Sequence, residues 1–363
     1  MVAELAERVA AAGGVMAASP NYPNAFWQLL LCAQLPPRKT RELLQELGSM
    51  VVDPISFLRT WRGLSQAERE NFQKCDMKAF ERGIAKGAHV LVDPPFSVKD
   101  PENFPVALFA IGDTRCLHHP KLAIVGTRRC TTYGEAASQK FAQHIGAAGV
   151  TVVSGGASGV DTAAHKGALA AGAPTASVFG CGVDISFPST NHNLFAQIAL
   201  NGCLLSQFGL GMPSLHHNFL TRNVVIAGLA DALLVVELPE KSGAQVTVQA
   251  AIEQDKPVFV VPGSISINNF RGSHQLIRDG GILVYHPDQI LEHMGWQKLA
   301  SAPVKELSPC QEQICSVLGP HALSVDKIAE LSEMDLADVM IELTELEVEG
   351  IVLRDGPGYI LSP

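Results

Sequence analysis

Seven short runs of apolar, often β-branched residues within residues 104–294 constrain the fold more than any other feature. Helical stretches such as YGEAASQKFAQHIGAAG separate the runs. The runs are apolar throughout instead of alternating, which is typical of strands buried on both faces. This alternation predicts βαβ units and an α/β fold, a doubly wound, mostly parallel Rossmann-like sheet. The seven runs are KLAIVGT, VTVVSG, PTASVFG, GCLLS, DALLVVEL, PVFVVPG and GILVY.

The chain has 363 residues, more than one hydrophobic core usually organises, so several domains are expected. Residues 20–90 contain helical runs that are broken at Pro36-Pro37 and at Gly48. This pattern predicts a small all-α domain before the central domain of residues 104–294.

The C-terminal part of the sequence has a different pattern. Residues 296–309 are expected to form a linker, because prolines bracket a short charged stretch there. Residues 310–363 show three short helical runs and then two strand-like runs around Asp355-Gly356. This order predicts a winged-helix-like domain.

Composition narrows the class of protein. Hydrophobic residues make up 47% and charged residues 17%, which indicates a folded chain. The eight cysteines form no CxxC pair and have no histidine at zinc-ligand spacing, so we expect reduced thiols and no metal site. No run is apolar enough to span a bilayer, and Glu4 and Glu7 do not suit a secretory signal. We therefore expect a cytoplasmic protein without membrane contact or cofactor.

The net charge of −9 is at first sight unfavourable for a nucleic-acid-binding protein, because phosphate neutralisation needs Lys and Arg. The charge is unevenly distributed, however. Residues 305–363 hold 12 acidic and 3 basic side chains, which leaves residues 1–304 with 24 of each sign. The acidity therefore belongs to the C-terminal segment, and the central domain remains a candidate for phosphate binding.

Two loops of the central domain predict a phosphate site. In a doubly wound sheet, ligands bind beyond the carboxyl ends of the strands, so the loops after the strands are where function is expected. The loop GTRR places Arg128 and Arg129 at the mouth of this crevice, after a tight exit at Gly126. The next loop, SGGASGVD, would let backbone amides approach an anion at a helix N-terminus.

Other interpretations of these loops stay open. The glycines can simply allow close helix packing, and neither the GxGxxG nor the Walker pattern is present. Asp161 and His165 share one helix face, where capping and packing explain them as well as a functional role does. Phe187 could stack on a base, and a buried Phe is an equally good interpretation.

The loops belong to an ordered set of motifs over about residues 105–290. The set is AIVGTR followed by YG, VSGxAxGVDxxAHxGAL, GxGVDxxFPxxN, FxxRNxxIAGL, VVExxxxSG, VPG and GSxxLIxDGG. In content and order, this set resembles the DprA (Smf) family of DNA-processing proteins. The resemblance implies a non-enzymatic, extended Rossmann domain that binds single-stranded DNA without sequence preference, loads RecA onto it and supports natural transformation. It also implies a sterile-alpha-motif-like N-terminal domain and, in some members, a C-terminal winged helix.

The resemblance places DNA contacts on Arg128, on the glycine-rich loop and on the pair Arg222-Asn223. Further strand-to-helix junctions add an aromatic residue, an asparagine and a third potential phosphate cradle. The resulting candidate nucleic-acid contacts are Gly126, Thr127, Arg128, Arg129, Ser154, Gly155, Gly156, Ala157, Gly159, Lys166, Phe187, Asn191, Arg222, Asn223, Ser242 and Gly243.

The sequence departs from the family pattern at two of these places. The usual RNR reads Arg222, Asn223, Val224, which removes one guanidinium. The usual SE after the fourth predicted strand reads Ser206, Gln207, which removes one carboxylate. Both departures bear on the expected strength of DNA binding and not on its site.

The balanced charge of residues 1–304 predicts weak binding by one monomer. A homodimer that presents two grooves to one strand would bind more tightly, because the second contact becomes intramolecular. The resemblance also implies a homodimer, with Leu276 and Ile277 as candidate contacts. The stretch DLADVMIELTELEVEG, where a winged helix would have its recognition helix, has no Lys or Arg, so we expect that it does not bind DNA.

The main alternative is an enzyme. Lysine-decarboxylase-like phosphoribohydrolases use a related Rossmann core on nucleoside monophosphates. They carry PGGxGTxxE where this chain reads SGAQVTVQAA, so the expected catalytic acid is missing. A serine hydrolase is disfavoured because no GxSxG elbow occurs. A protein that binds a small nucleotide as a signal stays open.

Overall fold

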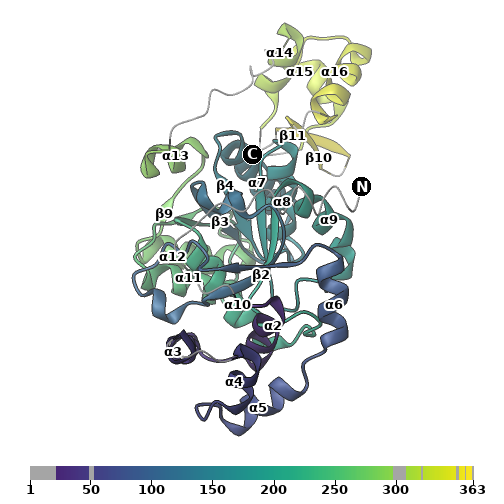
Figure 1. The fold of residues 1–363 in the computed structure, drawn as a ribbon. Helices are drawn as coiled ribbons and strands as arrows, with labels where there is room; N and C mark the ends of the chain where they lie inside the picture. The colour runs from purple at the N-terminus through teal and green to yellow at the C-terminus, as the bar shows by residue number, and fades with distance from the viewer. Residues whose placement is uncertain are drawn as a thin grey trace. The chain divides into compact units, whose positions relative to one another are not determined.

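The computed structural model describes residues 22–48, 53–296, 308–319, 322–348, 351–355 and 357–361. The chain divides into two compact units, residues 1–299 and residues 300–363 (Figure 1). The larger unit contains the predicted central sheet together with the N-terminal helices. The smaller unit contains the predicted winged helix.

The larger unit is built on a single sheet with the strand order β1-β2-β6-β5-β4-β3-β7-β8-β9. Strands β3 to β9 are parallel, whereas β1 pairs antiparallel with β2, and β2 with β6. The predicted α/β, mostly parallel fold is therefore confirmed, although the sequence pattern did not predict β1 and β2. The strands are β1 (His89–Val92), β2 (Ala107–Gly112), β3 (Lys121–Val125), β4 (Thr151–Ser154), β5 (Thr175–Phe179), β6 (Cys203–Ser206), β7 (Ala232–Val235), β8 (Val258–Val260) and β9 (Ile282–Leu283).

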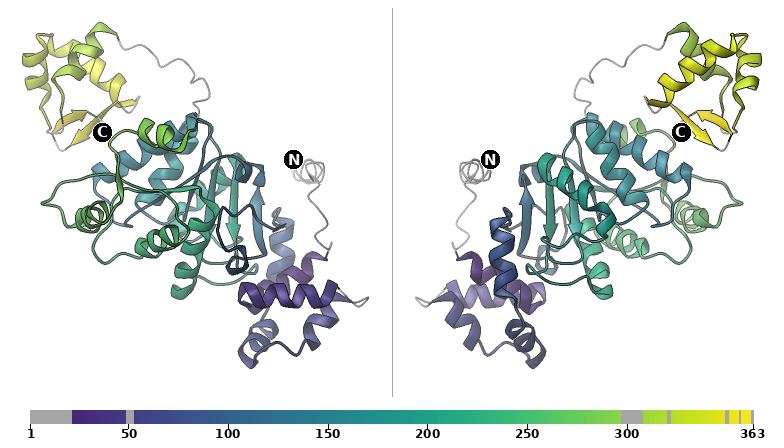
Figure 2. Two further views of the ribbon diagram at one scale, coloured as in Figure 1. Left: turned by 90° about the vertical axis from the view of Figure 1, so that its left-hand side faces the viewer. Right: turned by 90° about the vertical axis from the view of Figure 1, so that its right-hand side faces the viewer.

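Helices cover both faces of this sheet (Figure 2). One face packs against α7 (Thr132–Ala147), α8 (Val160–Ala170), α9 (His192–Asn201) and α13 (Asp288–Met294). The other face packs against α10 (His216–Leu229), α11 (Ala244–Glu253) and α12 (Arg271–Arg278). Because β4 and β7 lie on opposite sides of β3, a crevice is expected at the carboxyl ends of β3 and β7. Short 3-10 helices are η1 (Pro101–Asn103), η2 (Thr114–His118), η3 (Ser189–Asn191) and η4 (Asn268–Phe270).

The N-terminal helices pack on the antiparallel edge of the sheet. Their core includes Phe26 and Leu43, and it continues onto Val106 and Ala107 at the start of β2. Residues 66–85 form two helices, because Asp76 accepts a hydrogen bond from the backbone N of Ala79 at 3.0 Å and so starts a new helix. The helices are α2 (Asn24–Ala33), α3 (Pro37–Gly48), α4 (Pro54–Thr60), α5 (Gln66–Gln73) and α6 (Met77–Ala85).

The smaller unit has the element order of a winged helix, as predicted. Helices α14 (Pro309–Val317), α15 (Val325–Ser332) and α16 (Leu336–Val348) precede the antiparallel pair β10 (Val352–Asp355) and β11 (Gly358–Leu361). Ile314, Ile328 and Leu343, one from each helix, meet in a buried core. Most of the predicted linker, residues 297–307, lies outside the described residues.

Two classes of feature are absent from the described ranges. No helix there is long and apolar enough to cross a membrane. No group of three or more His, Cys, Asp or Glu side chains there is arranged to hold a metal ion.

Candidate nucleic-acid interface

A groove of about 670 Å³ opens at the carboxyl ends of β3 and β7, between the loops that follow these strands and the helix α10. This is the crevice that the doubly wound topology predicts. Its lining comprises Val125, Gly126, Thr127, Arg128, Arg129, Ala157, Asp161, His216, Phe219, Leu220, Arg222, Asn223, Ile226, Pro239, Lys241, Ser242, Gly243, Ala244, Gln245 and Thr247.

The rim of the groove carries the cations that are free to bind a ligand. Arg128, Arg129 and Lys241 are all exposed. None of them has a carboxylate oxygen within 4.0 Å in the part of the chain that the structure describes. Unpaired, solvated cations at the mouth of a concave site attract polyanions.

The loop that carries the two arginines is held from behind by Glu237, a fully buried carboxylate that follows β7. Its Oε1 accepts hydrogen bonds from the backbone N of Thr131, at 3.1 Å, and from the Thr131 hydroxyl. Its Oε2 accepts one from Asn269 Nδ2 at 2.9 Å, and the same amide donates to the backbone O of Arg129 at 2.9 Å. Glu237 and Asn269 therefore position the arginine loop without entering the groove lining.

The glycine-rich loop meets the arginine loop at close range. Gly159 has a φ of +79°, and a Cβ there would lie 2.5 Å from the backbone O of Thr127, so only glycine fits. Asp161, on the first turn of α8, accepts a hydrogen bond from the backbone N of Ala157 at 3.3 Å. Burial raises the pKa of Asp161. The amide of Ala157 is thus engaged by Asp161, which ties the glycine-rich loop to the first turn of α8, and a DNA contact at this loop stays a prediction.

Arg222 belongs to the floor of the groove, not to its rim. The side chain is 3% exposed, and its Nη1 donates hydrogen bonds of 2.5 Å to the backbone oxygens of Gly155 and Val178. Burial lowers the pKa of Arg222 to about 10, which leaves the guanidinium charged at neutral pH. The sequence predicted a cation that faces phosphate, whereas Arg222 ties the glycine loop to β5 and places a positive charge beneath the groove.

An aromatic pair lies between these cations. The ring of Phe219, on α10, lies 5.4 Å from the Arg128 guanidinium carbon and 5.6 Å from that of Arg222, measured to the ring centroid. The ring centroids of Phe187 and Phe219 are 5.4 Å apart, and Phe187 is 42% exposed. The interpretation of Phe187 as a buried residue is therefore wrong. The pair offers a surface on which a base can stack.

The remaining candidates divide between the groove and its support. Asn191 donates from its side chain to the backbone O of Gly156 at 3.0 Å, and Ser154 is buried with its hydroxyl bonded to the backbone O of Ile124. Lys166 is exposed on α8 but is not part of the lining. Gly126, Thr127, Arg128, Arg129, Ala157, Arg222, Asn223, Ser242 and Gly243 line the groove, whereas Ser154, Gly155, Gly156, Gly159, Lys166, Phe187 and Asn191 do not. DNA contact by any of them stays a prediction.

Among the lining residues that are not candidate contacts from the sequence, Phe219, Lys241 and His216 have side chains suited to a nucleic acid. Phe219 precedes Arg222 by three residues on one helix, and this spacing puts both side chains on the same face. Lys241 directly precedes the predicted junction at Ser242. Both signals were readable from the sequence once the helix and the junction had been placed.

The candidate dimer contacts lie on α12, away from the groove lining. Leu276 and Ile277 are half-buried and pack against the hydrophobic core beneath α10 and α11. A role for them in a dimer stays a prediction.

Comparison with known proteins identifies the family. Residues 92–295 match the family described as DNA recombination-mediator protein A, and residues 298–357 match the DprA winged helix domain. Protein Smf of Escherichia coli is 33% identical over 328 residues, covering 85% of this chain and 87% of that protein. The DprA crystal structure from Streptococcus pneumoniae superposes with a TM-score of 0.62 at 28% identity, covering 74% of this chain and 97% of that chain.

A second solved structure of the same family is similar to this chain. The DNA processing protein A of Helicobacter pylori, described for its single-stranded DNA binding mode, gives a TM-score of 0.52 at 31% identity, covering 57% of this chain and 95% of that chain. The family matches span the central sheet, the groove and the winged helix. The chain therefore belongs to the DprA (Smf) family of DNA-processing proteins.

Proposed function

We propose that this protein binds single-stranded DNA, without sequence preference, in the groove between the arginine loop and α10. The observation that carries the proposal is the rim, where Arg128, Arg129 and Lys241 are exposed and have no carboxylate oxygen within 4.0 Å in the described residues. Arg128 also lies over the ring of the groove-lining Phe219, which packs against the exposed Phe187. The Helicobacter pylori relative, described for its single-stranded DNA binding mode, supports this proposal.

The chemistry of the groove fits a single strand better than a duplex. Rim cations neutralise backbone phosphates, and unpaired bases expose the π-faces that Phe187 and Phe219 can stack on. A duplex keeps its bases stacked on each other and offers the aromatic pair nothing comparable. Stacking of this kind contributes about 1 to 3 kcal/mol per base and is tolerant of sequence. No group in this account performs covalent chemistry, so we propose a binding protein and not an enzyme.

The finer parts of the proposal follow the family resemblance. Few rim cations imply weak binding by one chain, and a homodimer, with Leu276 and Ile277 at its contact, would hold two grooves on one strand. Loading of RecA onto the bound strand, as part of natural transformation, is the cellular role that we propose. We place this activity in the cytoplasm.

The test is fluorescence anisotropy with a labelled single strand and the matching duplex, at two salt concentrations. We expect preference for the single strand and a salt dependence of about 0.7 log units of affinity per log unit of salt for each phosphate contact. Arg128→Ala should weaken binding about tenfold, because one charge-assisted contact is lost. Arg115→Ala serves as the control, since Arg115 is equally exposed but pairs with Asp113, before β3.

Either of two results would overturn the proposal. The first is equal binding of single strand and duplex. The second is binding that Arg128→Ala leaves unchanged. Binding of a mononucleotide without binding of either oligonucleotide would instead support a small-nucleotide-binding or nucleotide-hydrolysing Rossmann protein.

A further inference from the structure

Two cysteines of the N-terminal helices form a pair that lies apart from the groove lining. Cys32, on α2, is 4% exposed, whereas Cys75, between α5 and α6, is partly exposed. Nε2 of Gln28 lies 3.5 Å from the sulfur of each cysteine. The two thiols are also hydrogen-bonded to each other. A disulfide needs the sulfurs to approach to about 2.05 Å, so rotation of side chains already in contact can form it.

The two sulfurs have different surroundings. Cys75 lines a surface pocket of about 450 Å³, whose wall also contains Arg59 and Arg69, so a small polar solute can approach it from the solvent. Cys32 faces the interior instead, because a Cβ at Gly209, in the loop after β6, would lie 2.5 Å from the Cys32 sulfur. A reagent that arrives from the solvent therefore meets Cys75 first, and Cys32 is the thiol behind it.

The hydrogen bonds assign the same roles to the two thiols. A hydrogen bond from Cys32, together with one from Gln28, lowers the pKa of Cys75 against its partial burial and the nearby charge of Asp76. The hydrogen bond to Cys75, together with burial, raises the pKa of Cys32. The thiolate is the nucleophilic form of cysteine. Cys75 is therefore the nucleophile of the pair, and Cys32 keeps its proton until Cys75 has reacted.

We propose that Cys75 is an oxidation site for hydroperoxides and that Cys32 resolves the product as a disulfide. The Cys75 thiolate attacks one oxygen of the hydroperoxide, the O–O bond breaks, and the leaving oxygen takes a proton and departs as water or an alcohol. The Cys32 sulfur then attacks the sulfenic acid at Cys75, the S–O bond breaks, and hydroxide leaves with the Cys32 proton as water. The hydroperoxide accepts the two electrons that the sulfurs lose, and a dithiol reductant reverses the change.

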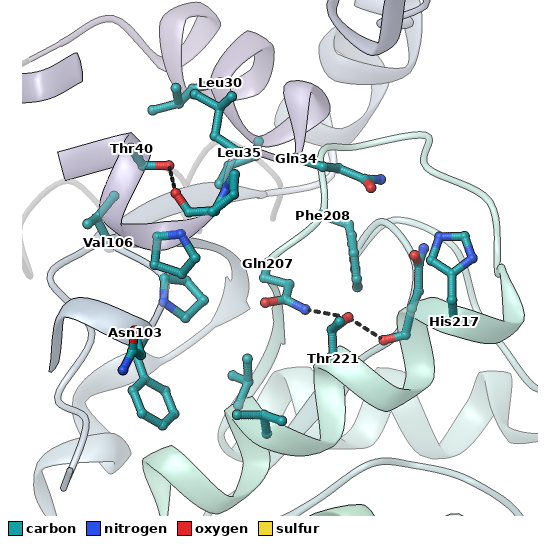
Figure 3. Close-up of a pocket in the computed structure, with 18 residues that line it drawn as sticks. Leu30, Gln34, Leu35, Thr40, Asn103, Val106, Gln207, Phe208, His217 and Thr221 are labelled. Carbon is teal, nitrogen blue, oxygen red and sulfur yellow. Dashed lines mark hydrogen bonds between the residues drawn. The ribbon is translucent and has the colours of Figure 1, made fainter. Parts of the chain in front are cut away.

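The pair lies where the N-terminal helices contact the central sheet. Gln28, which is fully buried, donates to the backbone O of Leu210 at 3.0 Å and accepts from the backbone N of Leu210 at 2.9 Å. Figure 3 shows the adjacent part of this contact, a cavity with Leu30 and Gln34 of α2 on one side and Phe208, in the loop after β6, on another. The disulfide would tie α2, which holds this loop, to the segment before α6. We expect the oxidised chain to resist unfolding better, since a cross-link restricts the unfolded chain.

A second cysteine pair in the same chain is a matched control. The sulfurs of Cys116 and Cys203 lie 3.7 Å apart, but the two side chains are only 5% and 0% exposed. A hydrogen bond to Cys116, together with burial, raises the pKa of Cys203 well above its usual value. This pair has the proximity of the first pair without its access to solvent, so we expect it to stay reduced when Cys32 and Cys75 are oxidised.

The test treats the full, reduced chain with hydrogen peroxide at neutral pH and maps disulfide-linked peptides by mass spectrometry. The Cys32–Cys75 peptide should form at least about tenfold faster than the Cys116–Cys203 peptide, because only the first pair has a thiol open to solvent. Cys310→Ser, which removes an exposed cysteine on α14, should leave that rate unchanged. Failure of the Cys32–Cys75 peptide to form while Cys310 is oxidised would overturn the proposal, as would equal rates for the two pairs.

Two variants test the roles of the two thiols. In Cys32→Ala, oxidation should stop at the sulfenic acid of Cys75, which dimedone labels, whereas Cys75→Ala should give no label at Cys32. The reverse pattern of labels would overturn the assignment of nucleophile and resolving thiol. The wild-type peptide map needs no substitution, so it decides the proposal even where a variant fails to fold. None of these readouts involves DNA, so failure here is distinguishable from failure of the proposed function.

Discussion

The floor and the rim of the groove both carry an arginine, but the two side chains have different roles. Arg222 in the floor is almost fully buried and donates two short hydrogen bonds to backbone oxygens, whereas Arg128 at the rim is exposed and has no carboxylate within 4.0 Å in the described residues. The floor side chain shapes the site, and the rim side chain is available to a ligand. We expect both side chains to support binding and only the one in the floor to matter for folding.

The largest expected effect is loss of stability in Arg222→Ala. The substitution leaves the backbone oxygens of Gly155 and Val178 without their donor and Asp161 without the buried charge that lowers its pKa. Removal of one member of such a buried set typically lowers the free energy of unfolding by about 3 kcal/mol. Chemical denaturation measures this loss of unfolding free energy. Arg128→Ala is the matched control, and we expect it to change the unfolding free energy by less than about 0.5 kcal/mol. Equal losses in the two variants would remove the distinction between floor and rim.

A smaller effect concerns pH and His165, which lies behind the floor on α8. The ring is fully buried, its Nδ1 lies 2.8 Å from Thr175 Oγ1, and burial lowers the pKa of His165 to about 3. Between pH 6.5 and about 3 the unfolded chain therefore binds a proton that the folded chain does not, so stability falls as pH falls. The expected contribution is about 1 kcal/mol per pH unit below pH 6.

Denaturation of His165→Gln at pH 7 and pH 5 measures this contribution by difference from the wild type. The difference is needed because burial also raises the pKa of Asp161, which acts in the opposite direction at acid pH. His118→Gln, at an exposed histidine, controls for the loss of any histidine. An unchanged pH slope in His165→Gln would show that the ring is protonated in the folded protein.

The same contrast explains what the sequence could predict. The rim was predictable because Arg128 and Arg129 directly follow an apolar strand, and the carboxyl ends of parallel strands meet at one edge. The floor was not predictable from the sequence, because the burial of Arg222 depends on Gly155 and Val178. These residues lie 67 and 44 positions away along the chain. Residue type alone cannot distinguish an arginine that binds phosphate from one that binds backbone oxygens.

The fold shows a similar division. Strands β3 to β8 were predictable because each is a mostly apolar run that is buried throughout. Strand β9 is half-exposed, and the apolar run GILVY still indicated it. Strand β1 is only half-buried and pairs antiparallel at the edge, so its sequence lacks that pattern. A proline-rich stretch, residues 93–106, lies between β1 and β2, and its pattern is typical of a loop. The N-terminal helices therefore continue into the sheet in a way that their own pattern does not indicate.

The smallest expected effect tests whether the rim acts without the C-terminal unit. Helix α16 carries Asp338, Glu342 and Glu345 and no Lys or Arg, so its charge opposes an approach to phosphate. A chain that ends at Trp296 retains the groove and the whole sheet. We expect its affinity for a single strand, measured by anisotropy at about physiological salt, to lie within about twofold of the full chain, since α16 offers no cation to a phosphate. A tenfold loss would mean that the winged helix contributes contacts of its own, and the interface would then extend beyond the rim.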